Sequence, residues 1–369
     1  MIRPLISVDA RTFGPTGLGA YVSDLLENFV STGHEFRFRV LCREPETMPR
    51  CCAGKFEFVR ATSPIYGLNE QWEIARLARG TDLLHCPHYN IPYFYRGPLV
   101  VTIHDLTHLV YPEFLPSRLA YLYASSMLRA AAHRARQIIT ISQFSKQAIC
   151  DRLEVNEEKV HVIPRVLSRS FFEMQGRDHG RLLRKLGVRT PYFLFVGLLK
   201  PHKNVQGLLR AFALIPETFR DSLQLVIAGK LDSFYPALRR ITEELSLQGQ
   251  VLFTGHVSEE ELHSLYACAM AFVLPSLNEG FGLPVLEAMA YGVPVIVSKT
   301  SSLPEVTGDA GILVDPTDPA SIAGGMVRVL SDEALRQQLS ERGRERTRLF
   351  SAKEFAQRHL EVYRRALEG

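Results

Sequence analysis

Short apolar segments rich in β-branched residues alternate with amphipathic segments of helical period along almost the whole chain. Several of them are near-continuously apolar, as strands buried on both faces of a parallel sheet must be. We expect strands in the first half at 5–10, 36–42, 56–61, 82–86, 99–105, 137–142 and 161–164. A second series is expected at 192–197, 223–229, 251–255, 271–275, 294–298 and 311–315. Helical patterns between the strands predict βαβ units, and hence an α/β fold with parallel sheets.

The strand series restarts after a polar segment at 165–179 that has no clear period. The chain has 369 residues, which is more than one typical domain. We therefore predict two doubly wound domains, an N-terminal one over 1–170 and a C-terminal one over 176–350. Doubly wound sheets bind ligands at the carboxyl ends of their strands, so the site is expected in a cleft that the two domains face.

Two capping boxes indicate where helices begin. Ser258 with Glu261 opens one helix, and Ser351 with Glu354 opens a final helix that runs through Leu367.

Composition narrows the class of protein. Hydrophobic residues make up 46% of the chain and charged residues 22%, which is typical of a globular protein, and the formal net charge of +4 argues against a dedicated nucleic-acid binder. The six cysteines form no C-x-x-C pair, so we read them as reduced thiols. No apolar segment has the length of a signal peptide or a membrane span. We therefore expect a cytoplasmic protein or one that rests on a membrane surface.

The most informative stretch is SLNEGFGLPVLEAMA, residues 276–290. It leaves the expected strand 271–275, and Pro284 suits the first turn of a helix that Gly292 would end. Residues 280–283 would then present backbone N–H groups at a helix N-terminus. Such groups favour an anion, in particular a phosphate.

Two carboxylates flank this anion site: Glu279 in the loop before it and Glu287, which we place in the first helical turn. On these residues alone two interpretations stay open. Glu287 complements the helix dipole while Glu279 is solvated, or both accept hydrogen bonds from hydroxyl groups of a ligand. A nucleotide sugar, which carries a diphosphate, a sugar and a ribose, would satisfy the whole stretch.

Other candidate groups also follow expected strands. Lys200, His202 and Lys203 come after the strand 192–197, at the end where such folds bind ligands. His104 ends the expected strand VVTIH and is followed by Asp105, although a lone histidine is more often a core residue. The loop GPTGLG, residues 14–19, is weak evidence alone because such loops are often only turns.

The sequence gives no reason to expect a metal or another cofactor. The segment HCPHY, residues 85–89, matches no standard zinc spacing, and no Asp-x-Asp pair occurs to hold a metal-bound diphosphate. Amide groups and lysine would then have to meet the phosphate charge. An NAD-dependent dehydrogenase is disfavoured because no strand is followed by the full G-x-G-x-x-G spacing with its acidic partner.

SLNEGFGLPVLEAMAYGVPVIVS, residues 276–298, resembles the E-x7-E signature of retaining glycosyltransferases of family 4, which have the two-Rossmann-domain GT-B architecture. Seven more stretches resemble other landmarks of that family, in its order: VDARTFGPTGLGAYVSDLL, VVTIHDLTHLVYPE, ITISQFSKQAI, FVGLLKPHKN, LVIAGK, FTGHVSEEELHSLYACA and SSLPEVTGDAGILVDPTD. The resemblance implies an N-terminal acceptor-binding domain, on which the helix 351–369 packs back, and a C-terminal donor-binding domain.

The resemblance also implies residue roles. Glu287 would bind the ribose, Glu279 the donor sugar, and Lys203 the diphosphate, while His104 would lie beside the reacting carbon. It implies His104, Glu279 and Lys203 as catalytic residues. The implied donor-binding residues are Gly17, Gly19, Gly197, Lys200, His202, Lys203, Gly229, Lys230, Gly255, His256, Val257, Glu279, Gly280, Phe281, Gly282, Leu283 and Glu287. Candidates on the acceptor side are Asp105, His88, Tyr89 and Asn90.

The chain departs from the family pattern at the phosphate. Leu198 and His202 stand at two positions where family members often carry an arginine. Arg165 could supply the missing charge, but a structural arginine in the linker is the stronger interpretation.

The segment 118–146 holds five arginines and lysines and no acidic residue. Part of it is a basic amphipathic helix, which either lies on anionic lipid or packs as an ordinary helix with a solvated rim. The first alternative would place the protein peripherally on the inner face of the plasma membrane.

The resemblance implies transfer of a hexose from a nucleoside diphosphate sugar to a glycan or glycolipid acceptor hydroxyl with retention of configuration, in the synthesis of cell-surface polysaccharide or glycolipid. GDP-mannose is favoured slightly because GLLKPHKN resembles this loop in bacterial mannosyltransferases, and UDP-glucose comes next. Two alternatives stay open: a nucleotide-sugar 2-epimerase of the same fold, and a non-catalytic nucleotide-sugar-binding partner.

Overall fold

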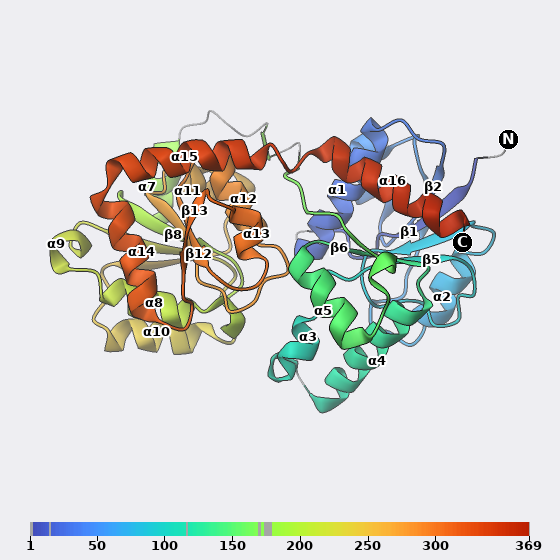
Figure 1. Ribbon diagram of the computed structural model, residues 1–369, viewed down its shortest axis with the longest axis horizontal. Helices are drawn as coiled ribbons and strands as arrows, with labels where there is room; N and C mark the ends of the chain where they lie inside the picture. Colours follow the sequence, from blue (N-terminus) through green and yellow to red (C-terminus); the bar gives the residue numbers. More distant parts are fainter. Residues whose placement is uncertain (1–2, 15, 116, 169–170, 173–178, 369) are drawn as a thin grey trace. The chain divides into compact units, whose positions relative to one another are not determined.

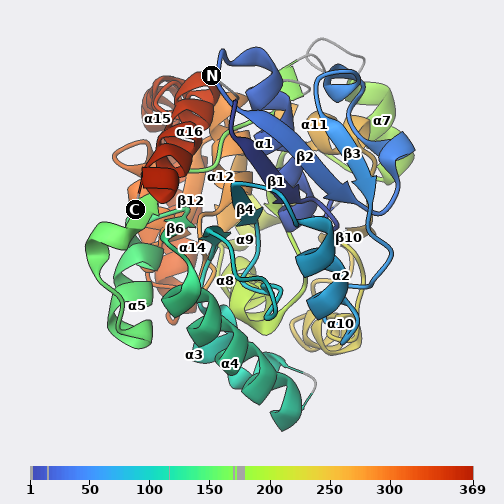
Figure 2. The same ribbon diagram turned by 90° about the vertical axis from the view of Figure 1, so that its right-hand side faces the viewer.

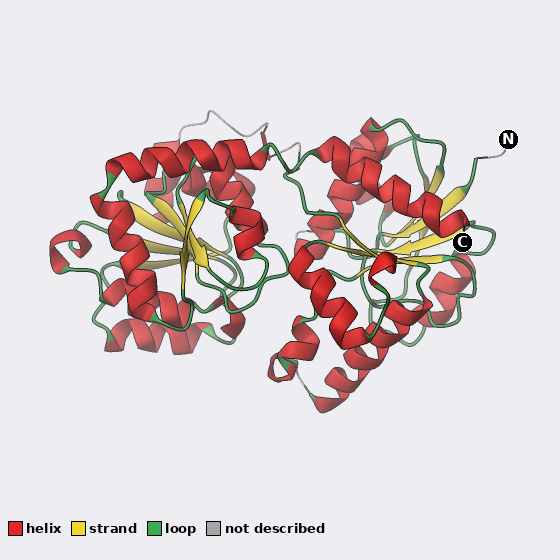
Figure 3. Cartoon of the chain, in the orientation of Figure 1, coloured by secondary structure: helices red, strands yellow, loops and turns green. Residues whose placement is uncertain are grey.

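A computed structural model describes residues 3–14, 16–115, 117–168, 171–172 and 179–368. The chain divides into two compact units, one formed by Met1–Val166 with Ser351–Gly369 and one by Leu167–Phe350. Each unit has a parallel sheet with helices on both faces (Figures 1 and 3). Each of the thirteen strands that the structure describes overlaps an expected strand, although several of them end earlier than expected.

The first unit contains a seven-stranded sheet with the order β3-β2-β1-β4-β5-β6-β7, and every neighbouring pair is parallel. Its strands are β1 (Leu5–Asp9), β2 (Arg37–Cys42), β3 (Glu57–Arg60), β4 (Leu83–Cys86), β5 (Leu99–Thr102), β6 (Gln137–Thr140) and β7 (Val160–Val162). The central strands β1, β4 and β5 are buried along their whole length, as their apolar sequences require.

Helices cover both faces of this sheet (Figure 2). They are α1 (Gly17–Ser31), α2 (Glu70–Leu77), α3 (Thr107–Val110), α4 (Arg118–Arg134), α5 (Gln143–Leu153) and α16 (Ala352–Glu368), with short 3₁₀ turns η1 (Pro45–Thr47), η2 (Arg50–Cys52), η3 (Pro112–Phe114) and η4 (Glu157–Lys159). The last helix, α16, packs on α1 and on strands β4, β5 and β6. The C-terminal segment therefore completes the unit that the N-terminus begins.

The second unit contains a six-stranded sheet with the order β10-β9-β8-β11-β12-β13, again all parallel. Its strands are β8 (Tyr192–Val196), β9 (Gln224–Ala228), β10 (Val251–Gly255), β11 (Ala271–Leu274), β12 (Val295–Ser298) and β13 (Gly311–Val314). The strand order reverses at β8, where the chain first runs outward to β10 and then returns to β11. Loops leaving β8 and β11 therefore meet at a topological switch point, which is where ligands bind in such sheets.

The helices of this unit are α7 (His179–Leu186), η5 (Pro201–Lys203), α8 (Val205–Ala213), α9 (Glu217–Arg220), α10 (Tyr235–Glu244), α11 (Glu259–Ala267), α12 (Leu283–Ala290), α13 (Leu303–Thr307), α14 (Pro319–Ser331) and α15 (Glu333–Thr347). Helices α7, α11, α12 and α15 lie over one face, and α8, α10 and α14 lie over the other (Figure 1).

Both expected helix starts are present. The capping box of Ser258 and Glu261 is complete, with each side chain bonded to the backbone N–H of the other residue. Ser351 Oγ accepts from the N–H of Glu354 at 3.4 Å, at the start of α16.

Candidate functional site

A partly buried ion pair lies where two loops of the second unit meet. Lys203, at the end of η5 after β8, places its Nζ 2.6 and 2.7 Å from the two carboxylate oxygens of Glu279, in the loop after β11. Ser276 Oγ donates a third hydrogen bond to this carboxylate at 2.8 Å. A buried carboxylate needs such compensation, so the contacts fix Glu279 and Lys203 at the carboxyl ends of adjacent strands.

The loop that carries Glu279 is also held through its backbone. Ser302 Oγ donates to the carbonyl of Glu279 at 2.9 Å, and the N–H of Leu277 donates to the carbonyl of His202 at 2.7 Å. The Phe281 ring is buried and lies edge-on to Phe350 at 5.7 Å. The side chain of Phe281 therefore packs in the interior of the unit. The donor contact predicted for this residue would have to involve its backbone.

Gly282, the residue immediately before the helix α12, has a backbone conformation that other residues avoid. Its φ of +92° lies in the left-handed region, and a Cβ there would stand 2.5 Å from Cδ2 of Leu303. Only glycine meets both conditions. By the geometry of a helix, N–H groups at its start have no carbonyl one turn back to bond. In α12, Pro284 has no N–H, and the N–H of Val285 donates to the carbonyl of Gly282 at 2.9 Å. This helix start lies next to the Lys203–Glu279 pair, and the anion site expected there stays a prediction.

Glu287 is not in the first turn of α12, contrary to our expectation. The helix begins at Leu283, so Glu287 is its fifth residue, where the helix dipole contributes little. Its Oε2 accepts a 2.7 Å hydrogen bond from the hydroxyl of Tyr266, a residue of α11 whose pKa is raised by burial and by Glu287 itself. The helix-dipole interpretation is therefore weakened, and the predicted contact of Glu287 with ligand hydroxyls stays a prediction.

Three predicted glycines end neighbouring strands of this unit. Gly197 N–H donates to the carbonyl of Ala228 at 3.0 Å, and Gly229 N–H donates to the carbonyl of Gly255 at 3.1 Å. A Cβ on Gly229 would lie 1.9 Å from the carbonyl oxygen of Gly197. Gly229 therefore has no room for a side chain, whereas a Cβ on Gly197 or Gly255 would meet only ordinary contacts, at 3.5 and 3.8 Å.

The remaining residues predicted to bind the donor differ in their contacts and in their exposure. Lys200 Nζ lies 3.9 Å from Asp232 and 5.2 Å above the ring of Phe234, so it is already engaged. Lys230 and His256 are exposed, and Val257 is half-buried. Their predicted roles stay predictions.

In the first unit, the strand β5 ends at Thr102, so His104 lies in the following loop and not at the strand end as we expected. Its ring contacts Tyr21 edge-on at 4.7 Å, and its Nε2 lies 3.0 Å from the carbonyl oxygen of Pro87. A carbonyl only accepts, so Nε2 carries the proton. Burial, followed by the charge of Arg165, lowers the pKa of His104 to about 4. The ring is therefore neutral at pH 7, and Nδ1 is an acceptor.

The glycine loop of the first unit begins α1. Thr16 Oγ1 caps this helix by accepting from the N–H of Gly19 at 3.0 Å. A Cβ on Gly19 would lie 2.1 Å from the carbonyl oxygen of Gly14, whereas Gly17 faces open space. Gly19 is therefore needed by the fold, and Gly17 is the position where a ligand could approach the backbone.

The predicted acceptor-side residues lie in two loops of the first unit. Asp105 Oδ1 accepts from the N–H of Thr107 at 2.9 Å and so starts α3. The ring of His88 contacts that of Tyr89 at 4.0 Å between centroids with a tilt of 35°, and burial lowers the pKa of His88 to about 3. Asn90 is buried and donates to Glu70 at 2.5 Å. His88 and Asn90 are thus close to one buried polar network. Asp105 instead stabilises the start of α3.

That network contains charged residues which our sequence reasoning missed. Arg11 donates to both carboxylate oxygens of Asp9 at 2.7 and 2.8 Å and lies 2.9 Å from Glu70, with all three side chains buried. Burial lowers the pKa of Arg11, but Asp9 and Glu70 together raise it by more than burial lowers it. The guanidinium therefore stays charged. Asp9 and Arg11 follow a buried strand, which was a usable signal. Glu70 has no local signal because the fold alone brings it to Arg11.

The side chain of Arg165 makes three contacts with residues of the first unit. Its guanidinium donates to Asp24 at 2.9 Å and to the carbonyl of Gly17 at 3.1 Å, and it lies 5.5 Å above the ring of Tyr21. These contacts favour the structural interpretation of Arg165 over a role at the phosphate.

The structure also changes the description of the basic segment 118–146. Arg134 donates to the carbonyls of Tyr93 and Tyr95, and Arg136 donates to the carbonyl of Ala366. These two arginines therefore tie loops and α16 to the unit. The exposed face of α4 begins with apolar side chains, because Leu119 is 78% exposed and Leu122 is 61% exposed.

None of the described helices is both long and apolar enough to span a bilayer. In the part of the chain that the structure describes, no three His, Cys, Asp or Glu side chains are grouped so that they could hold a metal ion.

Comparison with known proteins places this architecture. The family described as Glycosyltransferase Family 4 matches residues 15–169 of the chain, and the family described as Glycosyl transferases group 1 matches residues 184–346. An O-antigen chain mannosyltransferase B of Escherichia coli is 32% identical over 284 residues, which cover 76% of this chain and 74% of that relative. The O-antigen chain mannosyltransferase RfbU of Salmonella typhimurium is 28% identical over 303 residues, which cover 81% and 80% of the two chains.

The solved structure of sucrose-phosphate synthase from Thermosynechococcus elongatus aligns with 98% of this chain and 98% of its own, with a TM-score of 0.79 at 23% identity. Two parallel doubly wound units of this kind define the GT-B fold of glycosyltransferases. The chain belongs to glycosyltransferase family 4.

Proposed function

We propose that this glycosyltransferase moves a hexose from a nucleoside diphosphate sugar to an acceptor hydroxyl with retention of anomeric configuration. The observation that carries the proposal is the Lys203–Glu279 pair beside the glycine-bordered N-terminus of α12. GDP-mannose is the favoured donor, since two relatives of this chain are O-antigen mannosyltransferases, and UDP-glucose comes next. The product would be a cell-surface polysaccharide or its lipid-linked precursor.

Each donor group meets a complementary protein group in this proposal. The diphosphate lies at the amides of residues 280–283 and near Lys203, Glu279 accepts from sugar hydroxyls, and Glu287 accepts from the ribose. Negative charge grows on the departing diphosphate in the transition state, and preorganised amides and an ammonium group stabilise such charge strongly. No metal is needed for this assignment.

The acceptor proton has two bases available to it. One is a phosphate oxygen of the leaving group. The other is Nδ1 of His104, which is an acceptor because Nε2 donates to Pro87. We assign no covalent protein nucleophile, because the only buried carboxylate next to the anion site, Glu279, is occupied by Lys203 and Ser276 among the described residues.

A thermal-shift screen tests donor recognition. A ligand present at 100 times its Kd stabilises the folded protein by roughly 2.7 kcal/mol, so GDP and GDP-mannose should raise the Tm more than UDP, ADP or their sugars. If no nucleotide raises the Tm, the proposed donor site is wrong. Proton NMR of slow GDP-mannose hydrolysis then reports the anomer released first. Release of β-mannose would contradict retention.

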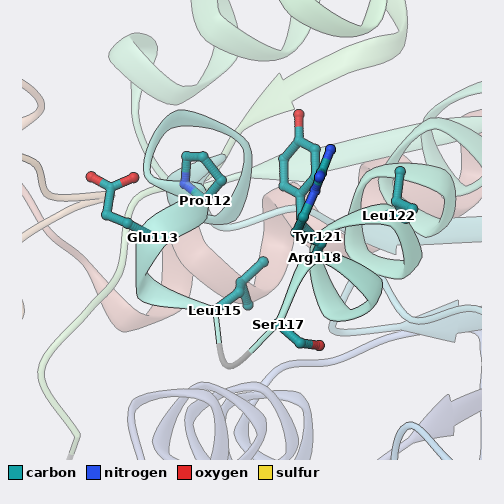
Figure 4. Close-up of a pocket in the computed structure, with 7 residues that line it drawn as sticks. All are labelled: Pro112, Glu113, Leu115, Ser117, Arg118, Tyr121 and Leu122. Carbon is teal, nitrogen blue, oxygen red and sulfur yellow. The ribbon is translucent and has the colours of Figure 1, made fainter.

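We also propose that α4 rests on the surface of an anionic membrane. Its exposed start carries Leu119 and Leu122 beside Arg118, and apolar side chains with arginine suit the interface of an anionic bilayer. An open pocket of about 510 Å³ lies at the same place, between η3 and the first turns of α4, lined by Pro112, Glu113, Leu115, Ser117, Arg118, Tyr121 and Leu122 (Figure 4). The apolar start of α4, more than its arginines, would enter the lipid.

Flotation with liposomes tests this surface. The protein should float with phosphatidylglycerol vesicles and much less with phosphatidylcholine vesicles, and Leu119→Ser with Leu122→Ser should abolish flotation. Leu349→Ser is a matched control, because Leu349 is 63% exposed and belongs to the second unit. Equal flotation of the double variant and the control would remove the membrane assignment.

A further inference from the structure

Tyr66 is held in a backbone conformation that a tyrosine avoids. Its φ is +68°, and the N–H of Gly67 donates to the carbonyl of Pro64 at 3.2 Å, so Tyr66 occupies the third position of a tight turn. Turns with a positive φ at this position normally carry glycine or asparagine there. Such strain persists only where the surroundings enforce it, and it concentrates at ligand-binding sites.

The surrounding contacts do enforce it. Glu73 accepts from the N–H groups of Thr62 and Ser63 at 3.0 and 2.7 Å, and Arg11 donates to the carbonyl of Ser63 at 3.1 Å. The loop before Tyr66 is therefore anchored to α2 and to the loop after β1. Packing does not explain the tyrosine itself, because its side chain is 52% exposed.

The ring of Tyr66 stands among other rings at the surface. It makes T-shaped contacts with His88 at 5.8 Å and with Tyr123 at 6.1 Å, and its hydroxyl lies 3.4 Å from Nε2 of His88. These contacts fix the ring without covering it. A fixed, half-exposed aromatic ring provides apolar area at a low entropic cost to a ligand.

Two neighbours of Tyr66, the preceding residue Ile65 and the contacting ring of His88, also line a small pocket that contains charged side chains. Asp9, Arg11, Thr12, Ile65, His88 and Asn90 line it, and its free space of about 10 Å³ suits one water-sized group. Asp9, Arg11 and Asn90 are each more than nine-tenths buried. The hydroxyl of Thr12 is buried without a hydrogen-bond partner among the described residues. A group that enters the pocket therefore meets buried polar atoms, one of which lacks a partner.

Charge decides which chemistry fits. One guanidinium, Arg11, lies between two carboxylates, Asp9 and Glu70, so the cluster has a net negative charge and repels a phosphate or carboxylate. The guanidinium already pairs with both carboxylates, so a second cation would have to compete with it for them. A neutral hydroxyl can both donate to a carboxylate and accept from Thr12. The pocket beside a flat apolar ring thus fits a sugar hydroxyl whose pyranose ring lies on Tyr66.

We propose that Tyr66 and this pocket form a subsite for a neutral pyranose of the acceptor glycan. The assignment to the acceptor rests on the proposed function, because all of these residues belong to the unit that does not carry the Lys203–Glu279 pair. Tyr66 supplies the stacking surface, and the Asp9, Arg11 and Thr12 pocket receives one hydroxyl. Asn90, which also lines the pocket, is held by its bonds to Glu70 and Tyr123.

The test is saturation-transfer NMR on the full chain with methyl α-mannopyranoside and methyl β-N-acetylglucosaminide as probes. We expect at least one pyranoside to bind, and Tyr66→Asn to weaken its binding about five- to ten-fold, in line with the usual contribution of an aromatic contact. Tyr66→Phe keeps the ring and should bind as wild type does. Tyr93→Ala is the matched control, because Tyr93 is an equally exposed tyrosine (52%) of the same unit, and it should not change binding.

Stability separates a binding role from a structural one. Asparagine suits a positive φ better than tyrosine, so Tyr66→Asn should leave the Tm unchanged or raise it. A lower Tm of Tyr66→Asn together with unchanged pyranoside binding would overturn the proposal. So would a wild-type protein that binds neither of the two pyranosides. Donor binding is read separately, through GDP in the thermal-shift screen. If GDP binds and neither pyranoside does, the subsite is wrong while the donor site stands.

Discussion

The ammonium of Lys203 lies 2.6 and 2.7 Å from the two carboxylate oxygens of Glu279, although 76 residues separate them in the chain. The pair joins the loops after β8 and β11 at the switch point of the second sheet. A ligand diphosphate would compete with Glu279 for Lys203. The two residues should therefore respond differently to substitution.

Glu279→Gln should lower kcat by about 100-fold, the usual effect of removing one preorganised polar group from an active site. GDP should bind within about threefold of wild type, because Lys203 then has no competing carboxylate and stays available to phosphate. Lys203→Met should weaken GDP binding and also lower kcat. Isothermal titration with GDP and initial rates of GDP-mannose turnover measure the two effects. Equal loss of GDP affinity in both variants would contradict this division of roles.

Glu287→Gln should weaken GDP binding about tenfold and change kcat at saturating donor by much less. A hydrogen bond to a charged acceptor contributes about 1.5–3 kcal/mol, and part of it survives with the amide oxygen. The sharpest control is a ligand, 2′,3′-dideoxy-GDP, which has no ribose hydroxyls to offer. It should bind wild type and Glu287→Gln with the same Kd. If Glu287→Gln weakens both ligands equally, this residue does not bind the ribose.

Strand positions were predictable because buried parallel strands are apolar along their length, a property written in each segment itself. The residues at which strands end were less predictable, because hydrogen bonding to the neighbouring strand determines them. The last partner pair of β5 and β6 is Thr102 with Ile139, so β5 stops before His104. The Glu279 loop was found because Gly282 and Pro284 mark a local turn into a helix. The Arg11–Glu70 contact and the φ of Tyr66 could not be predicted, because distant segments that meet only in the fold impose both of them.

Arg165→Ala should destabilise the protein without changing its affinity for donor. Arg165 and Asp24 form a buried pair, and removal of one partner from such a pair costs about 3–5 kcal/mol. Urea denaturation should show the loss, and the Kd for GDP should equal that of wild type. A weaker donor affinity at unchanged stability would restore the idea that Arg165 meets the diphosphate. Arg342→Ala is the control, since its contact with Asp309 is exposed and worth little.

Acid should destabilise the first unit through His359, a fully buried residue of α16. Its Nδ1 donates to the carbonyl of Phe355 at 2.7 Å, so Nε2 accepts the 2.7 Å hydrogen bond from the hydroxyl of Tyr21. A proton on Nε2 would place a charge in a fully buried site and would require the direction of this bond to reverse. Burial accordingly lowers the pKa of His359 from 6.5 to about 4.

The sign of the pH dependence follows from this pKa. Between pH 6.5 and pH 4 the unfolded chain binds a proton at His359 that the folded protein does not, so stability rises with pH across this window. The contribution is complete above pH 6.5 and falls by about 3 kcal/mol as the pH drops to 4. Urea denaturation at a series of pH values measures the slope. His359→Gln should reduce that slope, whereas the same change at the exposed His133 should not. An unchanged slope in His359→Gln would show that His359 is protonated in the folded protein as readily as in the unfolded chain.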